Sequence, residues 1–277
     1  MESIKQLLSR YGFSFKKQYG QNFITDTNLL KSIVSSAGVN GLTVLEIGCG
    51  AGTLTRELSA VAKKVIGYEI DYKLTPILNE TVGDKSNVEI IFKDVMKTPL
   101  NDLERYIGEE YALVANLPYY ITTPLIMRFI DGAKRLKKLI IMVQEEVAER
   151  LVAKENTAEY GAITASINAR ANTRIIKRVP RNMFLPAPKV DSAVVEIELV
   201  PNKFDIKDFN VYKKVLHSAF NNRRKMLVNN VMQIFSLSRQ EAEKVLTDCE
   251  VDLTARGETL SVKKFVEISN YIVDNGL

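Results

Sequence analysis

The sequence contains few of the residues that build disulfide frameworks, metal centres or membrane spans. It has two cysteines, Cys49 and Cys249, which form no CxxC pair, and one histidine, His217. These are too few for a disulfide scaffold or a zinc site, so we expect no metal and a reducing compartment. No apolar run approaches the ~20 residues that a membrane-spanning helix needs. The composition therefore favours a cytoplasmic protein with no membrane contact.

The net charge and the N-terminal residues bear on the protein's partners and on its cellular location. The formal net charge is +5 and the pI about 9.0, which suits a polyanionic partner but is also common in ordinary enzymes. Residues 1–20 lack the apolar core of a signal peptide, and their apolar residues follow a helical spacing. We find no long unexplained apolar surface and expect a monomer.

From residue 43 to 144, short runs of apolar and β-branched residues alternate with helical stretches. Nearly continuous apolar runs are typical of parallel strands covered on both faces, so the pattern predicts a doubly wound α/β domain. The five expected strands are 43–48, 64–70, 88–94, 111–116 and 137–144, and two more are expected near 173–179 and 191–200. Pro201 interrupts this pattern, and the residues after it have the spacing of short amphipathic helices. We expect one domain over residues 1–201 and a small all-helical domain over 202–277.

A glycine-rich loop comes directly after the first expected strand, in LEIGCGAG (45–52). Glycines allow backbone amides to approach a ligand, although a tight turn or a dinucleotide site would look similar. The spacing of Gly48, Gly50 and Gly52 is not the G-x-G-x-x-G of a pyrophosphate site, and Glu46 would repel a phosphate. The loop thus favours an adenosyl ligand without phosphates.

Polar residues stand at the ends of successive strands, where sheets of this type bind ligands. Glu69 ends the second strand at the interval that places a carboxylate on both ribose hydroxyls, and Asp94 and Asn116 end the third and fourth. Each carboxylate alone could equally be a helix N-cap. Together with the glycine loop, these three side chains make four polar features at the ends of successive strands, and this favours a ligand-binding site.

The string NLPYYIT (116–122) comes after the fourth strand and suggests methylation of an exocyclic amine. Acceptors on the Asn116 side chain and the Leu117 carbonyl could bind the two amine hydrogens and aim the nitrogen lone pair. Pro118 would fix the backbone, and Tyr119 could stack on a flipped base. The alternative is a loop in which the proline only starts a helix and the tyrosines fill the core.

Six strings together resemble the ribosomal RNA adenine dimethyltransferase family, most closely its small-subunit (16S, KsgA/RsmA-type) branch. They are QYGQNF, LEIGCGAG, YEID, NLPYYIT, VQEEVAERL and MFLPAPKVDSAV, in the family's order and covering nearly the whole chain. The resemblance implies a Rossmann-like methyltransferase domain with a mostly parallel seven-stranded sheet, whose N-terminal segment caps cofactor and RNA. It also implies an RNA-binding C-terminal domain and double methylation of two adjacent adenosines in the 3′-terminal hairpin loop of small-subunit rRNA.

The resemblance assigns roles to individual residues. S-adenosyl-L-methionine would be bound by Gln21, Asn22, Ile24, Gly48, Gly50, Glu69, Ile70, Asp94, Val95 and Asn116. Asn116, Leu117, Pro118 and Tyr119 would hold the target amine, and Phe184 would stack on the base, where a core aromatic is the alternative. Clustered basic residues are candidates for phosphate contacts, although a solvated helix face is the commoner meaning. They are Lys16, Lys17, Arg178, Arg181, Lys189, Arg223, Arg224 and Lys225, with Arg174 and Lys177 beside them.

Three other functions are consistent with parts of the sequence. A large-subunit (23S) adenine methyltransferase of the macrolide-resistance type would use the same chemistry. A binding factor in ribosome assembly without catalysis should show damage in the glycine loop or at Asn116, and both are intact. An NAD-dependent enzyme is disfavoured by the glycine spacing. We therefore expect a small-subunit rRNA dimethyltransferase with a part in subunit biogenesis.

Overall fold

The computed structural model describes residues 4–16 and 20–277, apart from the side chains of Tyr119 and Tyr120. The chain divides into two compact units. Unit 1 contains Met1–Ala148 and Thr173–Leu199, and unit 2 contains Glu149–Asn172 and Val200–Leu277.

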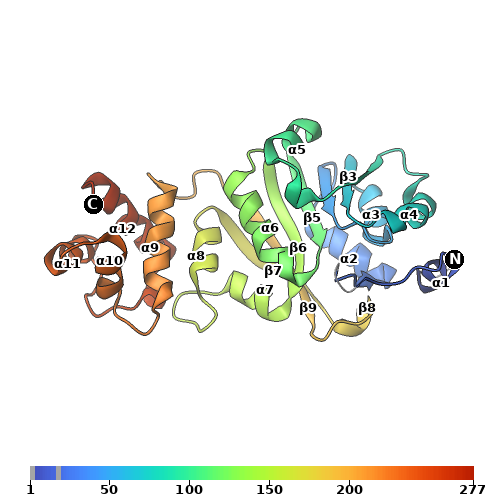
Figure 1. The fold of residues 1–277 in the computed structure, drawn as a ribbon. Coiled ribbons are helices and arrows are strands. Elements are labelled where there is room, and N and C mark those ends of the chain that lie inside the picture. Colours follow the sequence, from blue (N-terminus) through green and yellow to red (C-terminus); the bar gives the residue numbers. More distant parts are fainter. Residues whose placement is uncertain (1–3, 17–19) are drawn as a thin grey trace. The chain divides into compact units, whose positions relative to one another are not determined.

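Unit 1 is built on a seven-stranded sheet with strand order β4-β3-β2-β5-β6-β9-β7 (Figure 1). Strands β2 to β6 are paired in parallel, and β9 runs antiparallel to β6. The strands are β2 (Thr43–Ile47), β3 (Lys64–Glu69), β4 (Val88–Phe92), β5 (Tyr111–Asn116), β6 (Leu136–Gln144), β7 (Ala171–Val179) and β9 (Ser192–Leu199). The predicted mostly parallel α/β sheet is confirmed, with strand ends within two residues of those expected.

Helices cover both faces of this sheet. All five residues of β2 are buried, which requires a cover on each face. Figure 1 shows α2 and α6 on opposite sides of β5 and β6. The helices of unit 1 are α1 (Ile4–Arg10), α2 (Thr27–Ala37), α3 (Thr53–Ser59), α4 (Thr75–Val82), α5 (Leu100–Ile107), α6 (Tyr119–Gly132) and the start of α7 (Glu145–Val152).

Local signals set the ends of several helices. Asp26 accepts a hydrogen bond of 2.8 Å from the Leu29 N–H and so caps α2, which ends at Gly38 with φ +56°. In unit 2, Ser238 and Glu241 form a capping box at the start of α11 (Arg239–Asp248).

A second, two-stranded sheet pairs β1 (Phe23–Ile24) with β8 (Phe184–Leu185) in antiparallel fashion, so that Ile24 lies opposite Phe184. Strands of two residues carry no periodicity, and this pairing was therefore not predictable from the sequence. It joins the segment before α2 to the loop between β7 and β9.

Unit 2 is helical and has its own core. Its helices are α8 (Ala162–Asn168), α9 (Phe209–Asn221), α10 (Leu227–Phe235), α11 and α12 (Val262–Asp274), together with the end of α7. Tyr160 and Ala165 are buried in the same core as Tyr212 and Phe265, and the Tyr212 hydroxyl donates to the Ala165 carbonyl at 3.0 Å. Residues 149–172 therefore pack with the C-terminal helices, which the predicted boundary at 201/202 missed. A helical pattern shows that a face is buried, but not in which core.

Across residues 4–16 and 20–277, no helix is long and apolar enough to cross a membrane. Within the same ranges, His, Cys, Asp and Glu form no group of three or more that could hold a metal ion.

Candidate active site

The loop after β2 has a backbone that only glycine adopts easily. Gly48 and Gly50 have φ of +81° and +56°, in the left-handed region that side chains disfavour. A Cβ on Gly50 would lie 2.8 Å from the ring of Phe23. The Gly48 N–H donates to the Tyr68 carbonyl at 2.8 Å, which ties the loop to β3. The loop is thus held closely between β1 and β3.

This loop borders a cavity of about 400 Å³, a volume typical of small-molecule sites. Residues at the ends of β2, β3, β4 and β5 line it, together with residues 20–24. All ten residues predicted for the cofactor are in this lining, namely Gln21, Asn22, Ile24, Gly48, Gly50, Glu69, Ile70, Asp94, Val95 and Asn116. Leu117 and Pro118 line it as well. Among the lining residues that the sequence missed, Lys93 and Met96 are chain neighbours of predicted ones, whereas Leu30 and Leu74 are apolar side chains with no predicted neighbour.

Glu69, the last residue of β3, accepts hydrogen bonds from main-chain N–H groups of the glycine loop and of the turn after β3. Its Oε2 accepts from the Gly50 N–H at 2.8 Å, and its Oε1 accepts from the Ile70 and Asp71 N–H groups at 2.8 and 2.9 Å. Burial raises the pKa of Glu69, and these three backbone hydrogen bonds oppose that shift. A carboxylate offers about four acceptor directions. Three are used here, which leaves one acceptor direction, on Oε2, for a ligand; binding of ribose hydroxyls by Glu69 stays a prediction.

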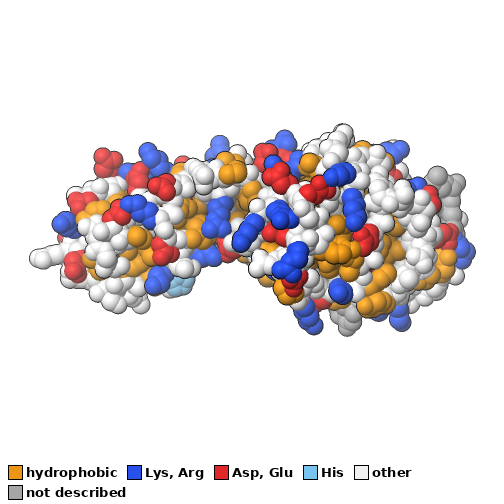
Figure 2. Space-filling model, turned by 90° about the horizontal axis from the view of Figure 1, so that it is seen from above, with side chains coloured by type: hydrophobic (Ala, Val, Ile, Leu, Met, Phe, Trp, Pro, Cys, Tyr) orange, Lys and Arg blue, Asp and Glu red, His pale blue; other side chains and the backbone are white. Residues whose placement is uncertain are grey.

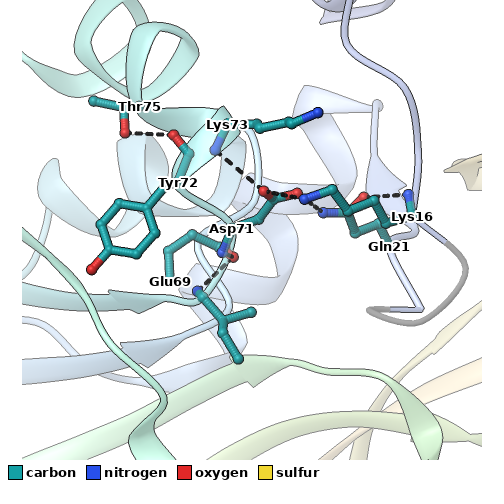
Figure 3. A network of polar contacts seen from close by, with 8 residues as sticks. Lys16, Gln21, Glu69, Asp71, Tyr72, Lys73 and Thr75 are labelled. Atoms are coloured by element: carbon teal, nitrogen blue, oxygen red, sulfur yellow. Dashed lines mark hydrogen bonds and ion pairs between the residues drawn. The ribbon is translucent and has the colours of Figure 1, made fainter.

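Asp71 lies two residues further on and joins the N-terminal segment to this turn (Figure 3). Its carboxylate, 2% exposed, accepts from Lys16 Nζ at 2.8 Å, Gln21 Nε2 at 3.0 Å and the Lys73 N–H at 3.2 Å. Burial raises the pKa of Asp71, but these hydrogen bonds and the Lys16 charge outweigh it and hold the pKa below its ordinary value. The ammonium of Lys16, predicted to contact RNA phosphate, thus binds a buried carboxylate of its own unit.

Asp94 lies at the cavity and is also a helix N-cap, the alternative given for it from the sequence. It lines the cavity, and it also caps the 3-10 turn η3 (Val95–Lys97), accepting from the Met96 N–H at 2.9 Å. The cap fixes the carboxylate at the end of β4.

Asn116, the last residue of β5, has a fixed side-chain amide. Its Nδ2 donates to the Asn22 carbonyl at 3.2 Å, and Asn22 Nδ2 in turn donates to the Gly20 carbonyl at 3.1 Å. Only the NH₂ group can donate to a carbonyl, so the other atom, Oδ1, is left as an acceptor. It has no hydrogen-bond partner among the residues described. Pro118, with φ −54°, precedes α6. The side chain of Tyr119 lies outside the described part.

Beneath the glycine loop lies a second acidic side chain, Glu46. It is 1% exposed, and neither oxygen has a hydrogen-bond partner in the described part of the chain. Burial raises its pKa to about 8. A raised pKa favours the neutral form of Glu46, and the residue does not line the cavity, so the structure gives no support to the predicted repulsion of a phosphate by this residue. The lining itself disfavours phosphate, because Lys93 is its sole cation among the described residues, beside Glu69 and Asp94.

Phe184 lies in the core of unit 1. It is 6% exposed, pairs with Ile24 across the β1–β8 sheet and packs in the cluster that includes α2 and α3. It is not in the cavity lining. This packing matches the core alternative, and stacking on a target base stays a prediction.

Many of the basic residues predicted to bind RNA contact protein groups. Arg178 pairs with Glu145, Arg174 with Glu196, and Arg181 donates to the Lys189 carbonyl at 3.1 Å. In unit 2, Arg223 donates to the Ala158 carbonyl at 3.1 Å, while Arg224 and Lys225 are exposed. Lys17 lies outside the described residues. Figure 2 shows basic and acidic side chains intermixed over the visible face, with no continuous basic surface there.

Comparisons with known proteins identify the family and the fold. The Ribosomal RNA adenine dimethylase family pattern matches residues 12–274. The chain is 38% identical to Ribosomal RNA small subunit methyltransferase A of Clostridioides difficile (strain 630) over 97% of its own length and 94% of the relative's. It is 41% identical to the protein of that name in Geobacillus thermodenitrificans (strain NG80-2), with the same coverage.

Two solved structures share the fold. A dimethyladenosine transferase from Plasmodium falciparum superposes with a TM-score of 0.80 at 24% identity, covering 92% of this chain and 98% of that one. The 23S rRNA methyltransferase ErmE superposes with a TM-score of 0.70 at 24% identity, covering 91% and 99%. The family indicated by the sequence strings is confirmed: the chain belongs to the ribosomal RNA adenine dimethylase family.

Proposed function

We propose that this protein transfers methyl groups from S-adenosyl-L-methionine to the N6 amines of two adjacent adenosines in the 3′-terminal hairpin loop of small-subunit (16S) rRNA, giving N6,N6-dimethyladenosine. The observation that carries this proposal is the convergence of the glycine loop, Glu69, Asp94 and Asn116 on one cavity. The name shared by the relatives, small subunit methyltransferase, supports the choice of rRNA.

The cavity suits an adenosyl ligand that carries a positive charge. Gly48 and Gly50 bring backbone into the lining where a Cβ on Gly50 would meet Phe23. The carboxylates Glu69 and Asp94 suit hydroxyls, amines and a nearby cation better than phosphates. S-adenosyl-L-methionine, when bound, supplies a methyl group on a sulfonium that an amine can attack.

The chain's own residues hold the target amine. Adenine N6 is a weak nucleophile because its lone pair is delocalised into the ring. Asn116 Oδ1 and the Leu117 carbonyl would accept its two hydrogens and turn the lone pair toward the methyl donor. The hydrogen bond from Asn116 Nδ2 to Asn22 fixes this orientation before RNA arrives. No strong base is needed, since the amine becomes acidic once alkylated.

RNA binding and cellular place complete the proposal. Exposed Lys189, Arg224 and Lys225, with Arg223, would contact phosphates without reading sequence. The helical unit would then act as an RNA-binding domain. In this proposal the protein acts as a monomer on small-subunit particles in the cytoplasm. It thereby takes part in small-subunit biogenesis.

The decisive experiment measures transfer of labelled methyl groups from S-adenosyl-L-methionine to unmethylated small and large ribosomal subunits, with nucleoside mass spectrometry of the RNA. Dimethyladenosine in small-subunit RNA alone is the expected result. Label in the large subunit would instead assign the resistance-type activity. Cofactor binding without label in either subunit would point to a binding factor in assembly.

A further inference from the structure

Asp71 contacts the cofactor cavity only through other residues. Asp71 does not line the cavity, but Gln21 and Glu69 do. The Asp71 side chain accepts a hydrogen bond from Gln21, and its main-chain N–H donates to Glu69 (Figure 3). It therefore lies between two parts of the cavity wall that come from distant segments of the chain.

The Asp71 carboxylate is buried and fully engaged. It is 2% exposed and receives three donors, of which the Lys16 ammonium carries a charge. A buried carboxylate is tolerated only with such partners. Gln21 is held at both ends, because its Oε1 accepts from the Lys16 N–H at 2.9 Å while its Nε2 donates to Asp71.

We propose that Asp71 is a positioning residue that sets the affinity for S-adenosyl-L-methionine by fixing Gln21 and the Glu69 turn, without touching the cofactor. This inference rests on the proposed function of the cavity. It assigns to Lys16 a part in the same network.

The arrangement of donors explains why a carboxylate is needed. In Asp71→Asn one oxygen becomes an NH₂ group. In one orientation this group faces Gln21 Nε2, and in the other it faces Lys16 Nζ and the Lys73 N–H. In either orientation the new NH₂ group faces an N–H donor, so neither of the two groups has an acceptor. Gln21 cannot rotate to compensate, since its Oε1 is held by the Lys16 N–H.

The same geometry yields a compensating variant. Combining Asp71→Asn with Gln21→Glu reverses one hydrogen bond: the new NH₂ group donates to the new carboxylate. That carboxylate can still accept from the Lys16 N–H, and the Asn oxygen can still accept from Lys16 Nζ and the Lys73 N–H. Every group regains a partner, and the net charge is unchanged.

The test measures cofactor affinity by calorimetry. Steady-state kinetics then give the KM for the cofactor and kcat separately for each variant. Asp71→Asn should weaken binding roughly tenfold, the cost of an unsatisfied buried group. At saturating cofactor its kcat should stay within about twofold, as for a residue outside the reacting groups. Gln21→Glu alone should also weaken binding, because two carboxylates would face each other, and the double variant should bind more tightly than the two single losses added together predict.

Glu80→Gln is the matched control. Glu80 also binds the N-terminal segment, through Arg10 and Tyr11, but at an exposed position away from the cavity, so its loss should leave cofactor affinity unchanged.

The outcomes separate the two proposals. Wild-type protein that binds no cofactor would overturn the proposed function and this inference with it. Wild-type binding with equal affinity in Asp71→Asn would overturn the inference alone, as would purely additive losses in the double variant. If Asp71→Asn does not fold by circular dichroism, Lys16→Met serves instead: it leaves the buried carboxylate undercompensated, and unchanged affinity in that variant would also reject the inference.

Discussion

The side-chain amide of Asn116 donates a hydrogen bond of 3.2 Å to the main-chain carbonyl of Asn22, 94 residues away in the sequence. This contact joins the end of β5 to the segment before β1. It also decides which end of the amide donates and which accepts. The group proposed to hold the target amine is therefore oriented by the fold and does not wait for the substrate.

Asn116→Ala is expected to reduce methyl transfer by about 10²-fold or more, because it removes a fixed acceptor for the amine. Cofactor affinity should weaken only modestly. Asn116→Asp keeps the shape but sets a carboxylate against the Asn22 carbonyl, and it too should be slow. Single-turnover transfer and calorimetry on both variants measure the two effects, and near-normal turnover in either would refute the assigned function of Asn116.

Glu46 should make the protein less stable as pH rises. Its pKa is about 8 in the folded chain against an ordinary value of 4.5, so between these values the folded state holds a proton that the unfolded state has lost. Stability then falls with increasing pH across this window. Glu46→Gln, which mimics the protonated form, should be more stable than wild type near pH 8, with the difference shrinking toward pH 4.5.

Urea unfolding at a series of pH values measures this difference. Glu109→Gln is a useful control, because Lys63 and Thr43 lower the pKa of that exposed carboxyl, and its removal should give no gain at high pH. A Glu46→Gln variant whose stability parallels wild type at every pH would show that Glu46 is not a buried neutral acid.

Phe184 is expected to contribute mainly to stability. Phe184→Ala should cost about 3–5 kcal/mol, since it empties a core position that also aligns Ile24 at the cavity. Phe184→Leu should lose less and still bind cofactor. A large fall in the transfer rate of the folded Leu variant at saturating cofactor would favour the base-stacking role, which the packing alone does not require.

The exposed basic residues of unit 2 should bind phosphate. Changing Arg223, Arg224 and Lys225 to Ala is expected to weaken RNA binding and to flatten its salt dependence, because fewer counterions are released. A control triple variant at Arg239, Lys244 and Lys263 removes the same charge elsewhere in the unit. Equal salt slopes for the two triple variants would exclude a specific contribution from the first cluster.

The sequence by itself determined the sheet, the order of its strands along the chain, and the polar residues that the strand ends bring to the cavity. All three depend on local signals: continuous apolar runs, a glycine loop that needs positive φ, and polar residues at strand ends that parallel pairing must bring to one edge. Glu69, Asp94 and Asn116 meet at this cavity because each stands at the end of a parallel strand, whereas Gln21 and Asn22, which precede β1, were indicated only by the family resemblance.

Tertiary structure alone decided what depends on partners far apart in the chain. Periodicity could not show that residues 149–172 belong to the core of unit 2, or that Phe184 pairs with Ile24. Nor could it show that Glu46 is buried without partners, or that Lys16 neutralises Asp71. The physical reason is common to all four: burial, ion pairing and pKa depend on which groups surround a side chain in space, and a one-dimensional pattern does not contain that information.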